Sequence, residues 1–170
     1  MKIIFVDGYN VINSWPNLKV QKDYSFDGAR KSLIDSLHNY SVYEGCKIII
    51  VFDAHKVKRS IEKKENLNKN ISIVFTKDGE TADSYIEREV HILGRRFEVN
   101  VVTSDWLEQQ TIFQRGAIRI SALEFYNEVI ETENRIKNKT IKNMYLSKNH
   151  LGDNVDEDIF KKLEEIRRSK

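Results

Sequence analysis

The sequence predicts an α/β fold with a mainly parallel central sheet of four to five strands and a C-terminal helical extension. Short apolar, β-branched runs alternate along the chain with stretches of helical periodicity. The first two runs are apolar throughout, which is typical of strands buried on both faces. The chain has 170 residues, of which 40% are hydrophobic and 32% are charged, so it has enough apolar material for one core under a solvated surface.

The predicted elements follow in a regular order. Strands are expected at 3–6, 48–52, 71–75 and 99–102, with a weaker fifth strand at 117–120. The only proline, Pro16, is expected in a loop with Trp15. Two stretches place apolar residues on one helical face: Ala29, Leu33, Leu37 and Tyr40 in the first, and Ile86, Val90, Leu93 and Phe97 in the second.

The remaining helices are predicted from local signals. A short helix is expected at about 105–114, and Ser121 with Glu124 forms a capping box that opens a helix through about Arg135. The segments 56–70 and 135–150 are polar and rich in Lys, and a last helix is expected from near Asp156. We therefore expect one domain at 1–136, followed by a basic linker and a C-terminal helix at 137–170.

Composition excludes several classes of protein. With one cysteine, Cys46, the chain has no internal disulfide framework. Asp7 interrupts the N-terminal apolar run, and no segment approaches the length of a membrane span, so we expect a cytoplasmic protein without a membrane partner. No Gly-x-Gly-x-x-Gly follows the first strand, so no nicotinamide or flavin cofactor is expected. The net charge is only +2, so nucleic-acid binding has to come from local basic patches.

Aspartates follow the predicted strands at the end where an α/β sheet binds its ligands. Asp7 and Asp53 end the first two strands, Asp105 follows the fourth, and Asp83 follows the third through a short connection. Asp83 lies three residues before Ile86, so it continues the apolar stripe of its helix. Clustered carboxylates raise one another's pKa, and a bound Mg²⁺ or Mn²⁺ removes that cost. One cysteine and four scattered histidines lack the spacing of a zinc site.

Each acid also has a structural interpretation. Asp7 with Gly8 fits a turn, Asp53 fits a cap of the following loop, and Asp105 after Ser104 fits a helix N-cap. Taken singly, Asp53 and Asp105 fit capping well. A cap explains one acid at a time, so capping does not explain why four acids lie at one edge of the sheet. Four acids in one place indicate a functional site.

Five sequence blocks resemble the YacP-like NYN domain family, a branch of the PIN-like nucleases. They are FVDGYNVI at 5–12, VFDAH at 51–55, GETADSYIE at 79–87, VTSD at 102–105 and GAIRISALEF at 116–125. The resemblance implies a PIN-like three-layer fold and Mg²⁺- or Mn²⁺-dependent RNA cleavage. It also implies association with the ribosome and cleavage of mRNA during translation, that is, a role in mRNA decay.

The resemblance assigns roles to individual residues. Asp7, Asp83 and Asp105 are the implied catalytic and metal-binding acids, with Asp53 as a fourth metal ligand. Many PIN-like nucleases carry a further acid just after the aspartate that corresponds to Asp105, but here Trp106 and Leu107 follow. This difference leaves the fourth carboxylate open among Asp53, Glu80 and Glu87. Glu80, Thr81 and Glu87 are expected to surround the ligands. The expected substrate contacts are Asn10, Ser104, His55, Lys56, Lys58 and Arg59.

Two other functions compete with an endoribonuclease. A non-catalytic RNA- or ribosome-binding protein on the same fold would bind without metal, but it gains nothing from repelling carboxylates next to phosphate. An aspartyl phosphohydrolase usually has two aspartates separated by one residue, and here Tyr9 occupies the second position.

Overall fold

A computed structural model describes residues 2–53, 63–93, 96–104, 117–148, 162 and 165–168. Within these ranges one sheet has six strands in the order β3-β4-β2-β1-β5-β6. All neighbouring pairs are parallel except β3 and β4, which are antiparallel. The strands are β1 (Lys2–Asp7), β2 (Lys47–Phe52), β3 (Lys63–Asn66), β4 (Ile71–Phe75), β5 (Glu98–Val102) and β6 (Ile118–Ile120).

The sheet has one more strand than the sequence predicted, and the added strand is β3. Its sequence Lys-Lys-Glu-Asn carries no apolar residue, so nothing in its composition indicates a strand. It pairs with β4 at the outer edge of the sheet, where backbone hydrogen bonds suffice and side chains stay in water. The other five strands lie where the apolar runs predicted them.

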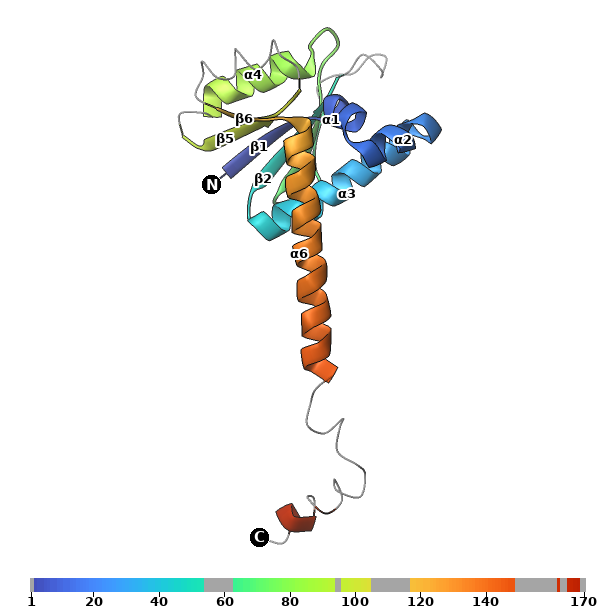
Figure 1. Cartoon of the computed structure of the whole chain (residues 1–170). Coiled ribbons are helices and arrows are strands. Elements are labelled where there is room, and N and C mark those ends of the chain that lie inside the picture. The colour runs from blue at the N-terminus through green and yellow to red at the C-terminus, as the bar shows by residue number, and fades with distance from the viewer. Residues whose placement is uncertain are drawn as a thin grey trace. The chain divides into compact units, whose positions relative to one another are not determined.

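Helices cover both faces of the sheet, as Figure 1 shows for α4 on one side and for α1, α2 and α3 on the other. Alternate residues of β1 enter two separate hydrophobic clusters, Ile4 and Val6 in one and Ile3 and Phe5 in the other. This alternation confirms the predicted three-layer α/β arrangement. The described helices are α1 (Gly8–Ser14), α2 (Pro16–Tyr24), α3 (Phe26–Glu44), α4 (Ala82–Leu93) and α6 (Ala122–Lys148).

The segment after β1 is helical, where the sequence predicted a loop around Trp15 and Pro16. Pro16 is the first residue of α2, a position that lacks an intrahelical acceptor for its N–H and therefore tolerates proline. Trp15 is only 1% exposed, and its indole Nε1–H donates to the carbonyl oxygen of Ala122 at 2.8 Å. Trp15 therefore ties the start of the chain to the start of α6.

Helix α6 begins where the capping box predicted it. The Ser121 hydroxyl accepts from the N–H of Glu124 at 3.2 Å, and the Glu124 carboxylate accepts from the N–H of Ser121 at 2.8 Å. The helix continues to Lys148, past the predicted end at about Arg135. The chain divides into two compact units, Met1–Glu133 and Asn134–Lys170, and the first contains the sheet. Residues 162 and 165–168 are also helical, as expected for a last helix.

No helix among the described residues is long and apolar enough to cross a membrane.

Candidate active site

Three neighbouring strands deliver polar residues to one edge of the sheet. Asp7 is the last residue of β1, Asp53 comes directly after β2, and Ser104 lies two residues after β5. Because β2, β1 and β5 are adjacent and parallel, their carboxyl ends lie at the same edge. The sheet topology therefore brings these three positions to one edge. Asp105 follows Ser104 but lies outside the described residues.

Asp7 is a buried carboxylate at the junction of β1 and α1. Its side chain caps α1 by accepting from the N–H of Asn10 at 3.0 Å. Only 9% of Asp7 is exposed. Burial raises the pKa of Asp7 to about 6, and the charges of Asp83 and Asp53 add to that rise, whereas the hydrogen bond from Asn10 opposes it. The negative charges of two carboxylates from distant parts of the sequence therefore act on the carboxylate of Asp7.

Glycine at position 8 allows the first turn of α1 to lie against the sheet. A Cβ at Gly8 would come within 2.2 Å of the Phe52 ring, closer than side chains can approach. The Phe52 ring also packs edge-on against Tyr9 at a centroid distance of 5.2 Å. Since Phe52 precedes Asp53, this packing fixes the end of β2 beside the end of β1.

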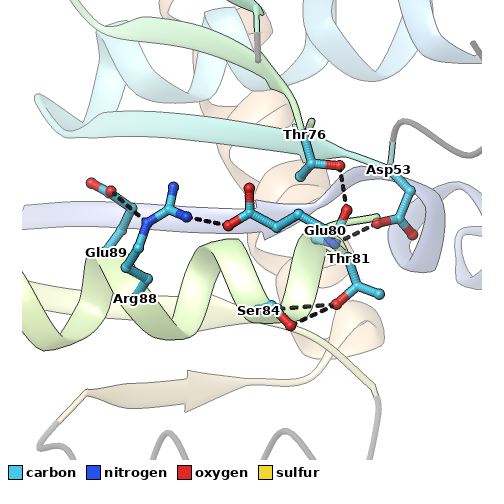
Figure 2. A network of polar contacts seen from close by, with 8 residues as sticks. Asp53, Thr76, Glu80, Thr81, Ser84, Arg88 and Glu89 are labelled. Atoms are coloured by element: carbon cyan, nitrogen blue, oxygen red, sulfur yellow. Dashed lines mark hydrogen bonds and ion pairs between the residues drawn. The ribbon is translucent and has the colours of Figure 1, made fainter. Parts of the chain in front are cut away.

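Asp53 accepts a hydrogen bond from the backbone N–H of Ala82, the first residue of α4 (Figure 2). The two residues are 29 positions apart in the sequence. An N–H in the first turn of a helix has no acceptor within that helix, and a carboxylate is an effective partner for it. Asp53 therefore caps α4. The loop that follows it, for which a cap by Asp53 was also expected, lies outside the described residues.

The connection between β4 and α4 is a structured turn. Gly79 has φ of 83°, and the N–H of Glu80 donates to the carbonyl oxygen of Lys77 at 3.1 Å, as in a turn with glycine at its third position. The Thr76 hydroxyl donates to the carbonyl oxygen of Glu80 at 2.7 Å. The Thr81 hydroxyl then accepts from the N–H of Ser84 at 3.2 Å. These contacts hold Asp83 in the first turn of α4.

Glu80 lies in the connection before α4, and Glu87 lies within α4. Glu80 is 9% exposed, and its carboxylate forms an ion pair with Arg88. In Figure 2 its side chain extends along α4 toward Arg88, away from Asp53. Glu87 is half-buried one turn beyond Asp83. Thr81 is the local cap of α4.

Asn10 and Ser104 link α1 to the end of β5. The side-chain oxygen of Asn10 accepts from the N–H of Ser104 at 3.1 Å. The Ser104 hydroxyl accepts from the N–H of Ala122 at 3.4 Å. Both side chains therefore have backbone partners at the edge where Asp7 lies. The other expected substrate contacts, His55, Lys56, Lys58 and Arg59, lie outside the described residues.

Sequence reasoning missed a cation at the same edge. The Arg30 guanidinium lies over the rings of Phe52 and Phe75, at 5.2 and 5.6 Å from their centroids. These two phenylalanines end β2 and β4. Arg30 follows the buried Ala29 in α3, and nothing in its sequence neighbours indicates that it reaches the strand ends.

The residues present fit a divalent cation in the chemistry of their donors. Asp7, Asp53 and Asp83 offer hard oxygen ligands, which Mg²⁺ and Mn²⁺ prefer. No Lys or Arg among the described residues forms an ion pair with Asp7, although Asp7 is buried. A bound cation would compensate this charge. Within the same residues, no group of three or more His, Cys, Asp or Glu side chains is placed so that it could hold a metal ion, and Asp105 lies outside them.

Comparison with known proteins agrees with this fold. The family model of the YacP-like NYN domain matches residues 4–168. The YacP protein of Bacillus subtilis (strain 168) is 45% identical over 143 residues, which cover 84% of this chain and 83% of the relative. The crystal structure of Rae1 (YacP) from Bacillus subtilis matches with a TM-score of 0.73 and 41% identity, over 99% of this chain and 95% of that chain.

A second crystal structure, of a single-substitution mutant of the same Bacillus protein, matches with a TM-score of 0.72 and 40% identity, over 84% of this chain and 82% of that chain. NYN domains have a nuclease-type fold and belong to the PIN-like nucleases, which generally use divalent metals. The family supports an RNA-related function. The chain belongs to the YacP-like NYN domain family.

Proposed function

We propose that the chain is a metal-dependent endoribonuclease that hydrolyses phosphodiester bonds of mRNA. The single observation that carries the proposal is the buried Asp7, whose pKa is raised to about 6 by burial and by the nearby charges of Asp83 and Asp53. Three carboxylates next to phosphate would weaken the RNA binding of a protein that had no catalytic role. A nuclease needs such acids to hold its cation.

In this proposal Asp7, Asp83 and Asp105 hold Mg²⁺ or Mn²⁺, with Asp53 beside them. When bound, such a cation supplies Lewis-acid stabilisation of the charge that develops on the phosphodiester. Asn10 and Ser104 position the RNA backbone at the end of β5, and Arg30 adds a positive charge for phosphate at the ends of β2 and β4.

The physiological part of the proposal rests on family membership. We propose that cleavage depends on the ribosome and on translation, that it serves mRNA decay, and that it takes place in the cytoplasm. The basic residues of the second unit, Arg135, Lys137, Lys139, Lys142 and Lys148, are suited to contact RNA phosphates. No acidic residue interrupts this series.

A cleavage assay with matched variants tests the proposal. Purified protein is incubated with mRNA and either Mg²⁺ or Mn²⁺, with and without translating ribosomes, and RNA binding is measured in parallel. The wild type should cut internally, whereas Asp7→Asn and Asp83→Asn should lose activity by on the order of 100-fold or more and retain RNA binding. The exposed Asp23 of α2 provides a control, and Asp23→Asn should cut normally.

Intact RNA after incubation of the wild type with ribosomes, message and either metal would contradict the proposal. Retained binding under those conditions would instead favour the non-catalytic RNA- or ribosome-binding protein. Full activity of Asp83→Asn would show that the acids at this sheet edge are not the catalytic ones.

A further inference from the structure

We infer that Asp53 is a positioning residue: its carboxylate fixes the first turn of α4, and thereby the place of Asp83 beside Asp7, instead of ligating the cation. This inference rests on the proposed function for its catalytic consequence. It changes the role that the family resemblance implies for Asp53, from a fourth ligand to a support for another acid.

The first step of the argument is the distribution of hydrogen bonds at the start of α4. The N–H groups of the first turn lack acceptors within the helix. The N–H of Ser84 donates to the Thr81 hydroxyl, which is a local cap. The N–H of Ala82 donates to Asp53, which comes from the end of β2. One N–H of α4 therefore donates to the connection that precedes this helix, and another donates to a residue at the end of strand β2.

The second step concerns what this remote cap connects. Asp83 directly follows Ala82, so the bond from Ala82 to Asp53 fixes the backbone next to Asp83. β2 pairs with β1 in parallel, and Asp7 is the last residue of β1. Asp53 therefore relates the helix that carries Asp83 to the strand pair that carries Asp7. The charges of Asp83 and Asp53 both act on the Asp7 carboxylate.

The third step is the chemistry of the Asp53 carboxylate. The partial positive charge at a helix N-terminus stabilises a carboxylate, which then competes less well for a cation. One Asp53 oxygen already accepts from Ala82, as Figure 2 shows. Asparagine caps helices about as well as aspartate but is a poor ligand for Mg²⁺ in a carboxylate site.

Three variants separate positioning from ligation. Asp53→Asn keeps an acceptor for the Ala82 N–H and removes the charge, whereas Asp53→Ala removes both. Asp83→Asn removes a proposed ligand and leaves the cap intact. Asp78, exposed on the same connection, serves as the matched control through Asp78→Asn. Each full-length protein is measured for amide hydrogen exchange at Ala82 without metal, for Mn²⁺ binding, and for kcat/KM on RNA.

The expected results form a pattern. Asp53→Asn should retain slow exchange at Ala82, Mn²⁺ binding and most of the activity. Asp53→Ala should accelerate exchange at Ala82 and lower kcat/KM by about 100-fold, because a displacement of about 1 Å in a catalytic group costs that much. Asp83→Asn should lose Mn²⁺ binding and activity with normal exchange at Ala82. Asp78→Asn should match the wild type throughout.

The inference is overturned if Asp53→Asn loses Mn²⁺ binding and activity as far as Asp83→Asn does, because Asp53 would then be a ligand. It is also overturned if Asp53→Ala leaves exchange at Ala82 unchanged. If Asp53→Ala does not fold, the comparison of Asp53→Asn with Asp83→Asn still decides between the two roles. A wild type that cuts no RNA would contradict the proposed function alone, and the exchange and Mn²⁺ measurements would still decide the role of Asp53.

Discussion

At the scale of single residues, Asp7 combines two demands that conflict in the absence of a cation. It ends a buried strand and caps α1, which requires that it be close to the core. It is also placed near Asp53 and Asp83, whose charges oppose its ionisation. Replacing Asp7 should therefore affect stability in a direction that depends on pH and on metal.

Asp7→Asn should stabilise the metal-free protein at neutral pH. Because the pKa of Asp7 is raised from 3.8 to about 6 in the folded protein, the stability contributed by its protonated form is present below pH 3.8 and is lost as the pH rises through 6. That rise corresponds to a cost of about 3 kcal/mol for the ionised group, which Asn avoids while still capping α1. Urea denaturation in chelator at pH 7.5 and pH 4 measures the difference.

The gain of Asp7→Asn should disappear at pH 4, where Asp7 is protonated in the folded wild type. Asp23→Asn should show no comparable dependence on pH. Added Mn²⁺ should stabilise the wild type and leave Asp7→Asn unchanged, because a ligand stabilises only the state that binds it. A variant that is less stable than the wild type at pH 7.5 in chelator would refute the cost assigned to burial of Asp7.

Gly8→Ala should destabilise the protein, contrary to the usual effect of alanine in a helix. The added Cβ would lie 2.2 Å from the Phe52 ring, so the ring has to move, and the expected loss is about 1–3 kcal/mol in the free energy of unfolding. Gly28→Ala in α3 is the control, because its Cβ would meet nothing nearer than 3.4 Å. Thermal denaturation of both variants should separate them, and equal stabilities would contradict the close packing of Gly8 against Phe52.

At the scale of elements, the connection from β4 to α4 is held from three directions. Thr76 binds the Glu80 carbonyl oxygen, Asp53 binds the Ala82 N–H, and Arg88 pairs with the buried Glu80 carboxylate. The second oxygen of that carboxylate, Oε2, has no hydrogen-bond partner among the described residues. Arg88 also packs on the Tyr85 ring, with the guanidinium carbon 4.8 Å from the ring centroid. The ion pair therefore anchors the connection to the body of α4.

Arg88→Leu should lower the free energy of unfolding by about 1–3 kcal/mol, because it leaves a buried carboxylate without its partner. Adding Glu80→Gln should restore part of the loss, since a neutral amide costs less to bury. A double-mutant cycle in urea measures the coupling between the two positions. Arg96→Leu, at an exposed arginine beyond α4, should change stability little. Additive effects of the two substitutions would show that the pair does not anchor the connection.

The elements differ in how well the sequence predicts them. Apolar runs located every strand except β3, whose side chains are all polar and which depends on backbone pairing with β4. Helix α2 was missed because a lone proline after Trp15 suggested a loop, although proline suits the first position of a helix. The part of α6 beyond Arg135 was missed because residues 136–143 are largely exposed, so they do not form a core-facing stripe.

The candidate site was predictable where it depends on the ends of strands. Parallel strands place Asp7 and Asp53 at one edge whatever the details of packing. The partner of Asp53 was not predictable, because Ala82 lies 29 residues away and a backbone N–H has no sequence signature. Arg30 was missed for the same reason: its contacts with Phe52 and Phe75 arise only when α3 packs on the sheet.

At the scale of the whole molecule, the sheet and its two hydrophobic clusters belong to the first compact unit. The last apolar member of those clusters is Val129, and Thr132 is the last buried polar residue among those described. We propose that residues 1–136 form the nuclease domain and that 137–170 adds affinity for RNA. The proposed division falls just after the boundary between the two compact units, Met1–Glu133 and Asn134–Lys170.

A protein truncated after residue 136 should fold with a thermal midpoint close to that of the full chain. It lacks Lys137, Lys139, Lys142 and Lys148, so its RNA affinity should be lower and less dependent on salt. Binding titrations at several salt concentrations, with calorimetry of both proteins, check this expectation. An unchanged salt dependence would show that the basic residues at 137–148 do not contact RNA. A truncated protein that fails to fold would contradict the proposed domain boundary.

The most direct test of the central claim is anomalous diffraction from crystals soaked in Mn²⁺, collected for the wild type and for Asp83→Asn. We expect a manganese peak in the wild type with oxygens of Asp7 and Asp83 as ligands, at about 2.0–2.3 Å, and no peak in Asp83→Asn. A wild-type map without manganese at Asp7, or a peak that persists at full height in Asp83→Asn, would contradict the claim that this sheet edge is the metal centre of a nuclease.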